Sequence, residues 1–149
     1  MNIYFVCTGN TCRSPMAEAI LKSKSIKGVE VRSAGIYAYE GSPISEHANA
    51  VLNQENIKTN HKSSLFNEQD AEWADLILTM TTAHKAKILY SFEEAHGKTY
   101  TLKEFAMPGD AHDIQDPFGG DFFVYKQTFE QLNEAINKLE IKLKMEEEI

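Results

Sequence analysis

The sequence contains few cysteines and no basic cluster, and each of these absences excludes a class of function. Only two of the 149 residues are cysteine, Cys7 and Cys12. Their spacing matches neither a Cys-x2-Cys metal motif nor a secretory disulfide framework. Fifteen Lys and Arg face 22 Asp and Glu, which gives a net charge of −7. We therefore expect no nucleic-acid partner and no anionic membrane surface.

Long apolar runs are also missing. No stretch approaches the ~20 apolar residues of a membrane span. Residues 1–20 lack a basic segment followed by an apolar one, which argues against a secretory signal. These absences predict a cytoplasmic protein. With 42% hydrophobic residues and no linker or repeat, the sequence predicts one domain over 1–149 with its own core.

Short apolar runs alternate with amphipathic stretches along the chain. Such alternation predicts right-handed crossovers and a parallel sheet covered by helices on both faces, an α/β three-layer sandwich. Residues 103–120, rich in Pro and Gly, are expected to form a long loop. The pattern predicts strands at 2–6, 29–33, 76–80 and 100–102, and helices at 14–26, 45–56, 82–92 and 121–146.

The last expected helix has a single apolar seam with alternating steps of four and three residues. This seam predicts packing on the sheet, which needs a helix to cover it. A coiled-coil dimer would use the same seam and is the less favoured interpretation. The seam consists of Tyr125, Phe129, Leu132, Ile136, Leu139 and Leu143.

Residues 7–14 place small residues between an expected strand and an expected helix. A loop of this kind directs several backbone N–H groups to one point, where the helix dipole adds partial positive charge. Gly9 allows a positive φ, and Asn10 tolerates the left-handed region better than other non-glycine residues. The segment predicts a phosphate-binding loop, to which Thr8, Gly9, Asn10, Thr11, Cys12 and Ser14 would contribute.

Cys7 would lie at the bottom of this anion site. The dipoles that hold a phosphate also favour a thiolate, so we expect a lowered pKa and a nucleophilic sulfur. Arg13 offers a planar fork of donors that matches two phosphoryl oxygens. Ser14 is expected to cap the following helix and to donate a hydrogen bond to the thiolate. A buried, inert Cys7 and a surface Arg13 are the less favoured interpretation.

Attack by sulfur on a phosphoryl group requires an acid that protonates the leaving group. The loop over 103–120 and the residue after it offer four aspartates, and the residue chemistry does not choose among them: Asp110, Asp113, Asp116 and Asp121. A metal site made from His112 with two of these aspartates is disfavoured, because the spacing matches no ligand pattern.

At residues 7–15 the chain resembles the low-molecular-weight protein tyrosine phosphatases, whose loop reads Cys-x-Gly-Asn-x-Cys-Arg-Ser-Pro. The likeness extends to Asp116-Pro117-Phe118. It implies a sheet of order 2-1-3-4, Asp116 as general acid and Phe118 as pocket wall. By position, Ser33 and His61 resemble the pair that holds the loop asparagine. The resemblance implies phosphorylated protein substrates, no metal or organic cofactor, and a monomer or weak dimer.

The phosphorylated residue depends on the loop wall. Thr11 stands where tyrosine-specific relatives carry an aliphatic residue. A guanidinium has N–H groups that cost ~1–3 kcal/mol each when buried unpaired, so a hydroxyl-bearing wall suits it better. Phe118, where eukaryotic members have tyrosine, resembles a bacterial branch that acts on protein arginine. The sequence favours phosphoarginine, with phosphotyrosine as the alternative.

Other functions remain as weaker alternatives. An arsenate reductase can use the same loop but needs further cysteines, which this chain lacks. A non-catalytic phosphate-binding module would need neither Cys7 nor Asp116. Oxidised Cys7 could be trapped by Cys12 as a reversible disulfide, or Cys12 could simply pack inside the loop. Tyr37 and Tyr39 are candidates for a further pocket wall.

Overall fold

Four parallel strands form the centre of the molecule. The computed structural model describes residues 1–109 and 111–147. The strands are β1 (Asn2–Cys7), β2 (Glu30–Gly35), β3 (Leu76–Thr79) and β4 (Thr99–Thr101). They are ordered β2-β1-β3-β4, and every neighbouring pair is parallel. The expected fold class and strand order are confirmed.

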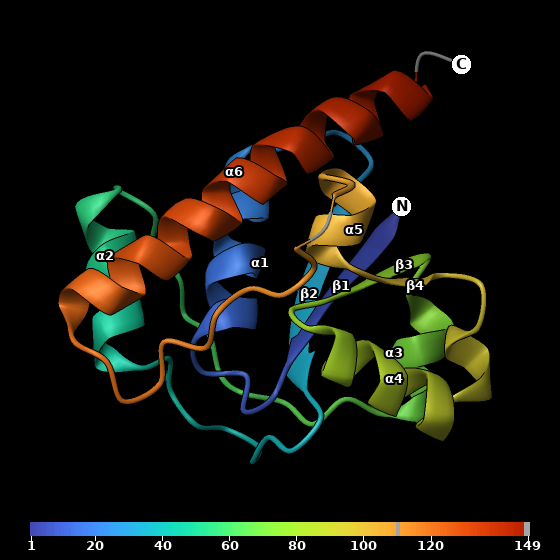
Figure 1. Cartoon of the computed structure of the whole chain (residues 1–149), viewed down its shortest axis with the longest axis horizontal. Coiled ribbons are helices and arrows are strands. Elements are labelled where there is room, and N and C mark those ends of the chain that lie inside the picture. Colours follow the sequence, from blue (N-terminus) through green and yellow to red (C-terminus); the bar gives the residue numbers. More distant parts are fainter. Residues whose placement is uncertain (110, 148–149) are drawn as a thin grey trace.

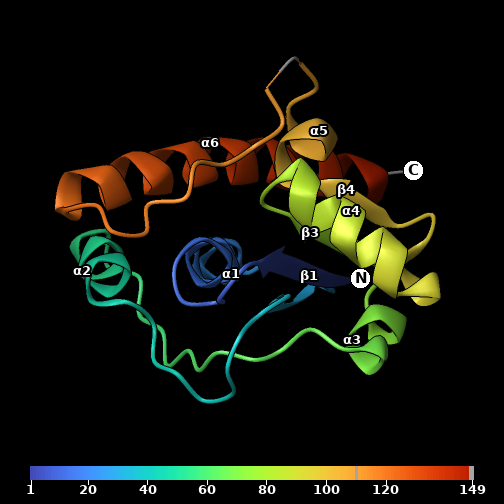
Figure 2. The same ribbon diagram turned by 60° about the horizontal axis from the view of Figure 1, so that its bottom comes forward.

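Helices cover both faces of this sheet (Figures 1 and 2). One side carries α1 (Arg13–Ser23), α2 (Glu46–Gln54), α5 (Leu102–Ala106) and α6 (Phe122–Glu147). The other side carries α3 (Glu68–Trp73), α4 (Thr82–Ser91) and the short 3-10 helix η1 (Glu93–Ala95). The sheet therefore lies in the middle layer of three, as the sequence predicts.

The central strand β1 shows why the sheet is covered on both faces. Successive side chains point to opposite faces of a strand. Ile3 and Phe5 belong to the hydrophobic core on the α1 side. Tyr4 and Val6 belong to the core on the α4 side. All four side chains are buried, so the strand contributes to both cores and reads as a continuous apolar run.

The seam of α6 is buried within the chain. All six seam residues, from Tyr125 to Leu143, are at most 5% exposed. The helix packs mainly across α1, α2 and α5, and its seam belongs to the same hydrophobic core as Ile3 and Phe5 of β1. Because this seam is already covered, it is not available for a coiled-coil partner.

Besides the 3-10 turn η1, two short α-helices were not expected. Helix α3 begins with a capping box, in which Asn67 and Asp70 each bind the other's backbone N–H. Helix α5 begins with the same arrangement between Thr101 and Glu104, inside the segment expected to be loop. Capping of this kind satisfies free N–H groups of a first turn, so it supports helices of five or six residues. The long loop therefore begins only after α5.

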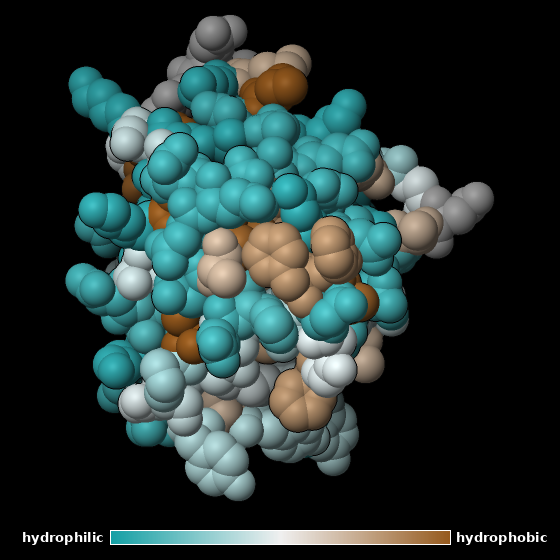
Figure 3. All heavy atoms as spheres, turned by 90° about the vertical axis from the view of Figure 1, so that its left-hand side faces the viewer, coloured by the Kyte–Doolittle hydropathy of each residue, from teal (hydrophilic) through white to brown (hydrophobic). Residues whose placement is uncertain are grey.

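The face of the molecule drawn in Figure 3 offers limited apolar area. The face over α2 and the start of α6 is mostly hydrophilic, with a small apolar group near its centre (Figure 3). Among the described residues, no helix has both the length and the apolar character required to cross a bilayer.

Candidate active site

The loop between β1 and α1 lies at the carboxyl edge of the sheet. β1 has β2 on one side and β3 on the other, so successive crossovers leave it in opposite directions. Ligands of open parallel sheets bind at such a point. A cavity of about 280 Å³ opens there, and Asp116 and Phe118 from the distant segment before α6 reach it. Its lining consists of Cys7, Thr8, Gly9, Asn10, Thr11, Cys12, Arg13, Asp116 and Phe118.

Cys7 ends strand β1 with its side chain almost completely buried, at 3% exposure. Its Sγ lies 2.8 Å from the hydroxyl of Ser14. Burial raises the pKa of the Cys7 thiol, while the Ser14 hydroxyl, the backbone of Ser14 and Asn10, and the Arg13 guanidinium favour the thiolate. Burial outweighs these contacts, so the expected lowered pKa is wrong. The prediction counted the loop dipoles and omitted desolvation.

Ser14 does not cap the helix. The cap position of α1 is Cys12, which makes no side-chain capping bond. The Ser14 hydroxyl is instead fully buried between Cys7 and the Asn10 amide, whose Nδ2 donates to it over 2.8 Å. The expected contact with the sulfur is present, and the expected cap is not.

Asn10 adopts the left-handed backbone conformation, with φ of 57°. Gly9 would also allow a positive φ but does not adopt one. The Asn10 side chain donates to Ser14 and, over 3.0 Å, to Ser33. Its Oδ1 accepts from the Ser64 backbone at 2.9 Å, and its carbonyl accepts from His61 Nε2 at 2.7 Å. Four contacts therefore hold a conformation that a non-glycine residue rarely adopts.

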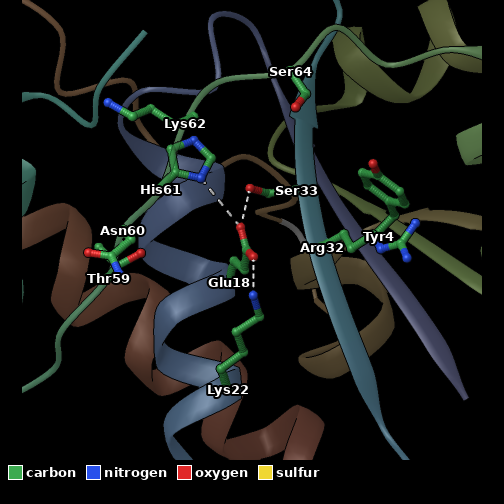
Figure 4. A pocket seen from close by; sticks show the side chains of 10 residues that line it. All are labelled: Tyr4, Glu18, Lys22, Arg32, Ser33, Thr59, Asn60, His61, Lys62 and Ser64. Atoms are coloured by element: carbon green, nitrogen blue, oxygen red, sulfur yellow. Dashed lines mark hydrogen bonds and ion pairs between the residues drawn. The ribbon is translucent and has the colours of Figure 1, made fainter. Parts of the chain in front are cut away.

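Glu18 forms the outer layer of this support (Figure 4). Its Oε1 accepts a hydrogen bond from Ser33 at 2.6 Å and lies 3.5 Å from His61 Nδ1. Lys22 approaches the other carboxylate oxygen at 2.5 Å. Burial opposes ionisation, but these three contacts hold the pKa of Glu18 below its ordinary value. Sequence reasoning missed Glu18, which reaches Asn10 only through Ser33 and His61.

Arg13 begins helix α1 and is buried, at 4% exposure. Its Nη1 donates to the carbonyl of Ile114 at 3.0 Å, and its Nη2 lies 3.5 Å from Asp116 Oδ2. The guanidinium thus links the phosphate-binding loop to the segment that carries Asp116. Such a fixed fork is suited to binding two oxygens of one phosphoryl group.

Only one of the candidate aspartates faces the cavity among those that the structure describes. Asp113 accepts from the backbone of Thr82 at the start of α4, and Asp121 accepts from Val124 at the start of α6. Asp110 lies outside the described residues. Asp116 lines the cavity with a side chain that is 52% exposed, and its Oδ1 accepts from the Phe118 backbone. The geometry therefore brings Asp116 together with Cys7 and Arg13.

Cys12 lies on the side of the loop that faces α6. Cys12 Sγ lies 3.3 Å from the Tyr125 hydroxyl and 3.5 Å from the Ser45 hydroxyl. Burial and the Cys12 sulfur raise the pKa of Tyr125 to about 12. Both cysteines are free thiols. Thr11 lines the cavity and is half-buried.

Two residues that sequence reasoning passed over also contact the loop. His84, from α4, places Nε2 2.8 Å from the Thr8 hydroxyl. Gly35, at the end of β2, approaches so closely that a Cβ there would lie 2.3 Å from the Thr8 carbonyl oxygen. No sequence spacing connects either residue to the loop. Tyr37 and Tyr39 are 63% and 84% exposed and do not line the cavity.

Carboxylates that could share a cation occur elsewhere. Within residues 1–109 and 111–147, the one group of potential ligands in close proximity is Glu68, Glu72 and Glu94. These side chains belong to α3 and η1, outside the cavity. In the loop cavity, the groups that can face an anion are Arg13, the backbone N–H groups and the hydroxyls of Thr8 and Thr11.

Comparisons with known proteins agree with this geometry. The family model described as low molecular weight phosphotyrosine protein phosphatase matches residues 2–148. A protein-arginine-phosphatase of Geobacillus stearothermophilus is 48% identical over 145 residues, covering 97% of each chain. The protein-tyrosine-phosphatase PtpB of Staphylococcus epidermidis is 39% identical, covering 95% of this chain and 99% of that protein.

A solved structure is similar in three dimensions as well. It is the YwlE arginine phosphatase, as a C7S mutant with a phosphorylated active-site serine. The TM-score is 0.93 at 44% identity, and the match covers 97% of this chain and 96% of that one. A phosphoryl group is thus carried by the side chain at the active-site position of a protein with the same fold.

Proposed function

The chain belongs to the low molecular weight phosphotyrosine protein phosphatase family, and from this we propose that it removes phosphate from phosphoarginine in proteins through a cysteinyl-phosphate. One observation supports the proposal most strongly: Cys7, Arg13 and Asp116 line a single cavity although they lie up to 109 positions apart, the interval from 7 to 116. That cavity brings together a nucleophile, an anion clamp and an acid, which phosphoryl transfer through sulfur requires.

In the first step, Cys7 attacks phosphorus as the thiolate, the form that Ser14, Asn10 and Arg13 favour although burial raises the pKa of its thiol. The S–P bond forms while the bond from phosphorus to the guanidinium nitrogen of the substrate breaks. Asp116, as a carboxylic acid, donates its proton to that departing nitrogen. Arg13 and the loop N–H groups stabilise the equatorial oxygens. The leaving group departs as an arginine side chain that carries this proton in its guanidinium, and the phosphoryl group stays on sulfur.

In the second step, water attacks the cysteinyl-phosphate. Asp116, now a carboxylate, accepts a proton from this water, so the same residue serves as acid and then as base. The S–P bond breaks, and its electron pair returns to Cys7 as thiolate. Inorganic phosphate is released, and the starting protonation state of both residues is restored. The Ser14 hydroxyl, 2.8 Å from the sulfur, stabilises the thiolate at both ends of the cycle.

Three observations support arginine as the substrate residue. Thr11 lines the cavity with a hydroxyl that can pair with a guanidinium N–H. Asp116 lines the same cavity as the loop. Hydrolysis of phosphoarginine depends on such an acid because the nitrogen that leaves is very basic. The relative from Geobacillus stearothermophilus, at 48% identity, is named a protein-arginine-phosphatase.

Phosphotyrosine is the second candidate. The family model carries that substrate in its description, and PtpB of Staphylococcus epidermidis is named a protein-tyrosine-phosphatase. Phe118 offers an 82% exposed aromatic ring at the rim of the cavity, which could pack on a phenyl ring. A binding module without turnover would use the same loop and would leave Cys7 without a role.

The deciding experiment compares turnover of phosphoarginine and phosphotyrosine peptides with otherwise identical sequences. We expect kcat/KM to favour the phosphoarginine peptide, and Thr11→Ile to reduce that preference by about tenfold or more because it removes the hydroxyl partner. Thr82→Ile, on the exposed start of α4, is the matched control. A wild-type preference for phosphotyrosine would overturn the choice of substrate and leave the chemistry intact.

The chemistry itself is tested with para-nitrophenyl phosphate. The wild type should release para-nitrophenol, and Cys7→Ser should release none. The same assay with a chelator present should be unchanged, because the proposed steps use Arg13 and backbone N–H groups and no metal. Turnover in Cys7→Ser would refute the cysteinyl-phosphate. We further propose a cytoplasmic location and phosphorylated proteins as partners.

A further inference from the structure

His84 is a buried histidine in which one of the two ring nitrogens has no hydrogen-bond partner in the part of the chain that the structure describes. It lies in the first turn of α4 and is 5% exposed. Its Nε2 lies 2.8 Å from Thr8 Oγ1, the side chain that follows Cys7 and lines the cavity. Its Nδ1 is buried and has no hydrogen-bond partner among the described residues. The ring therefore makes one polar contact, and that contact is with the phosphate-binding loop.

The unpaired Nδ1 indicates which nitrogen carries the proton. A neutral imidazole has one N–H and one bare nitrogen. If Nδ1 carried the proton, a buried N–H donor would be left without an acceptor, which native structures rarely tolerate. If Nε2 carries it, the buried atom is only an unused lone pair, which is the less costly arrangement. The Nε2–H tautomer is therefore favoured, and Thr8 Oγ1 is then the acceptor.

The ring is neutral near pH 7 because its surroundings oppose a positive charge. Burial and the nearby Arg13 guanidinium lower the pKa of His84 to about 4, although Asp116 and Asp113 act in the opposite direction. A ring protonated on both nitrogens would place a second positive charge beside the loop, close to that of Arg13. The neutral ring, with its single N–H directed at Thr8, is therefore the form of His84 that is present near pH 7.

We propose that His84 is a positioning residue whose Nε2–H donates to Thr8 and so leaves the Thr8 hydroxyl proton free to donate to a phosphoryl oxygen of the substrate. A hydroxyl carries one proton and two acceptor lone pairs. When a lone pair is occupied by His84, the proton is not needed there. Thr8 follows the nucleophile directly, so its hydroxyl can add a side-chain donor to the loop N–H groups. The proposal rests on the proposed phosphatase function and deepens it.

The tautomer can be measured without any activity. Two-dimensional ¹H–¹⁵N spectra of ¹⁵N-labelled protein at pH 7 distinguish the protonated ring nitrogen from the bare one through their couplings to the ring carbon-bound protons. We expect His84 to carry its proton on Nε2. A proton on Nδ1, or a fully protonated ring, would overturn the proposal whatever the substrate of the enzyme is.

Three variants test the hydroxyl. Thr8→Val should lower kcat/KM for para-nitrophenyl phosphate and weaken inhibition by orthovanadate, both by about tenfold to a hundredfold, because a hydrogen bond to a charged oxygen is lost. Thr8→Ser restores the hydroxyl and should recover most of both. Thr82→Val, a change of the same kind on the α4 surface, is the matched control. Equal activity of Thr8→Val and wild type would overturn the proposal.

A double-mutant cycle tests the link to His84. His84→Phe should cause a loss similar to that of Thr8→Val in the wild-type background and little further loss in the Thr8→Val background. Additive losses would show that His84 acts elsewhere and would refute its role on Thr8. If His84→Phe does not fold, the ring spectrum and the Thr8 variants still decide the matter. Absence of wild-type turnover would refute the proposed function instead, and the spectrum would still test the tautomer.

Discussion

The floor and the rim of the active-site cavity are built in opposite ways. On the floor, Asn10 and Ser14 are fully buried and Arg13 is 4% exposed, and hydrogen bonds join Asn10 to Ser14, to Ser33 on β2 and to His61. At the rim, the Asp116 side chain is 52% exposed and Phe118 is 82% exposed. The only link that Asp116 makes to the floor in the described chain is the 3.5 Å approach to Arg13.

This difference matches the two tasks of the reaction. Stabilising charge on a phosphoryl group requires donors that are fixed before the substrate arrives. Donating a proton to the leaving group and then accepting one from water requires a side chain that can adjust between steps. The floor is therefore suited to anion stabilisation and the rim to proton transfer. Variants on each side should fail in different ways.

The largest effect is expected at the rim, from Asp116→Asn. An amide cannot deliver a proton, so kcat for a phosphoarginine peptide should fall by about 10³-fold. The loss should be smaller for para-nitrophenyl phosphate, whose leaving group needs little protonation. Steady-state rates with both substrates measure the ratio. Asp121→Asn, which keeps a capping side chain at α6, should lose little, and equal losses on both substrates would argue against proton donation.

On the floor, Arg13→Lys should reduce kcat/KM by about 10²-fold, because a point charge replaces a fork that binds two oxygens. Unlike Asp116→Asn, this loss should be the same for both substrates, since both present the same phosphoryl oxygens. Arg32→Lys changes the only other arginine, which is exposed outside the cavity, and serves as the control. A loss that depends strongly on the leaving group would contradict the division between floor and rim.

Asn10→Ala should combine a moderate kinetic loss with lower stability. Alanine keeps the cost of a positive φ but loses the contacts with Ser14, Ser33 and Ser64, which should lower the free energy of unfolding by about 1–3 kcal/mol. Denaturant titration measures this change, with the exposed Asn53→Ala on α2 as the control. Unchanged stability would mean that the loop keeps its conformation without this support.

The smallest expected effect is a shift in pH dependence from Ser14→Ala. The Ser14 hydroxyl favours the thiolate, so its loss should raise the pKa of Cys7 further. Less thiolate is then present at a given pH, and the acidic limb of kcat/KM should move to higher pH. Ser23→Ala, at the other end of α1, should leave the profile in place. A shift to lower pH would contradict the assigned contact.

Periodicity and loop chemistry made most of this architecture predictable. The continuous apolar runs of β1 and β3 and the spaced seam of α6 give signals that do not depend on tertiary context. The spacing of Cys7 and Arg13 around small residues likewise identified the loop. The choice of Asp116 came from resemblance, and the structure adds a physical reason: Asp113 and Asp121 are occupied by backbone N–H groups at helix starts.

What the sequence did not reveal depends on contacts through space or on backbone angles. Glu18 and His84 support the loop from α1 and α4, and no spacing in the chain marks them. The sequence offered both Gly9 and Asn10 for the left-handed region, and the contacts that select Asn10 come from Ser14, Ser33 and Ser64. Helix α5 was assigned to loop because its capping box covers only five residues, too few to show a period.

The contact at Gly35 means that the shape of the catalytic loop is partly encoded on a different strand. A methyl group there would push against the carbonyl of Thr8 and displace the residue next to the nucleophile. A homologue that kept Cys7, Arg13 and Asp116 but had any side chain at position 35 is therefore expected to lose hydrolase activity. When genomes are searched for working members, this glycine deserves to be inspected together with the chemical residues.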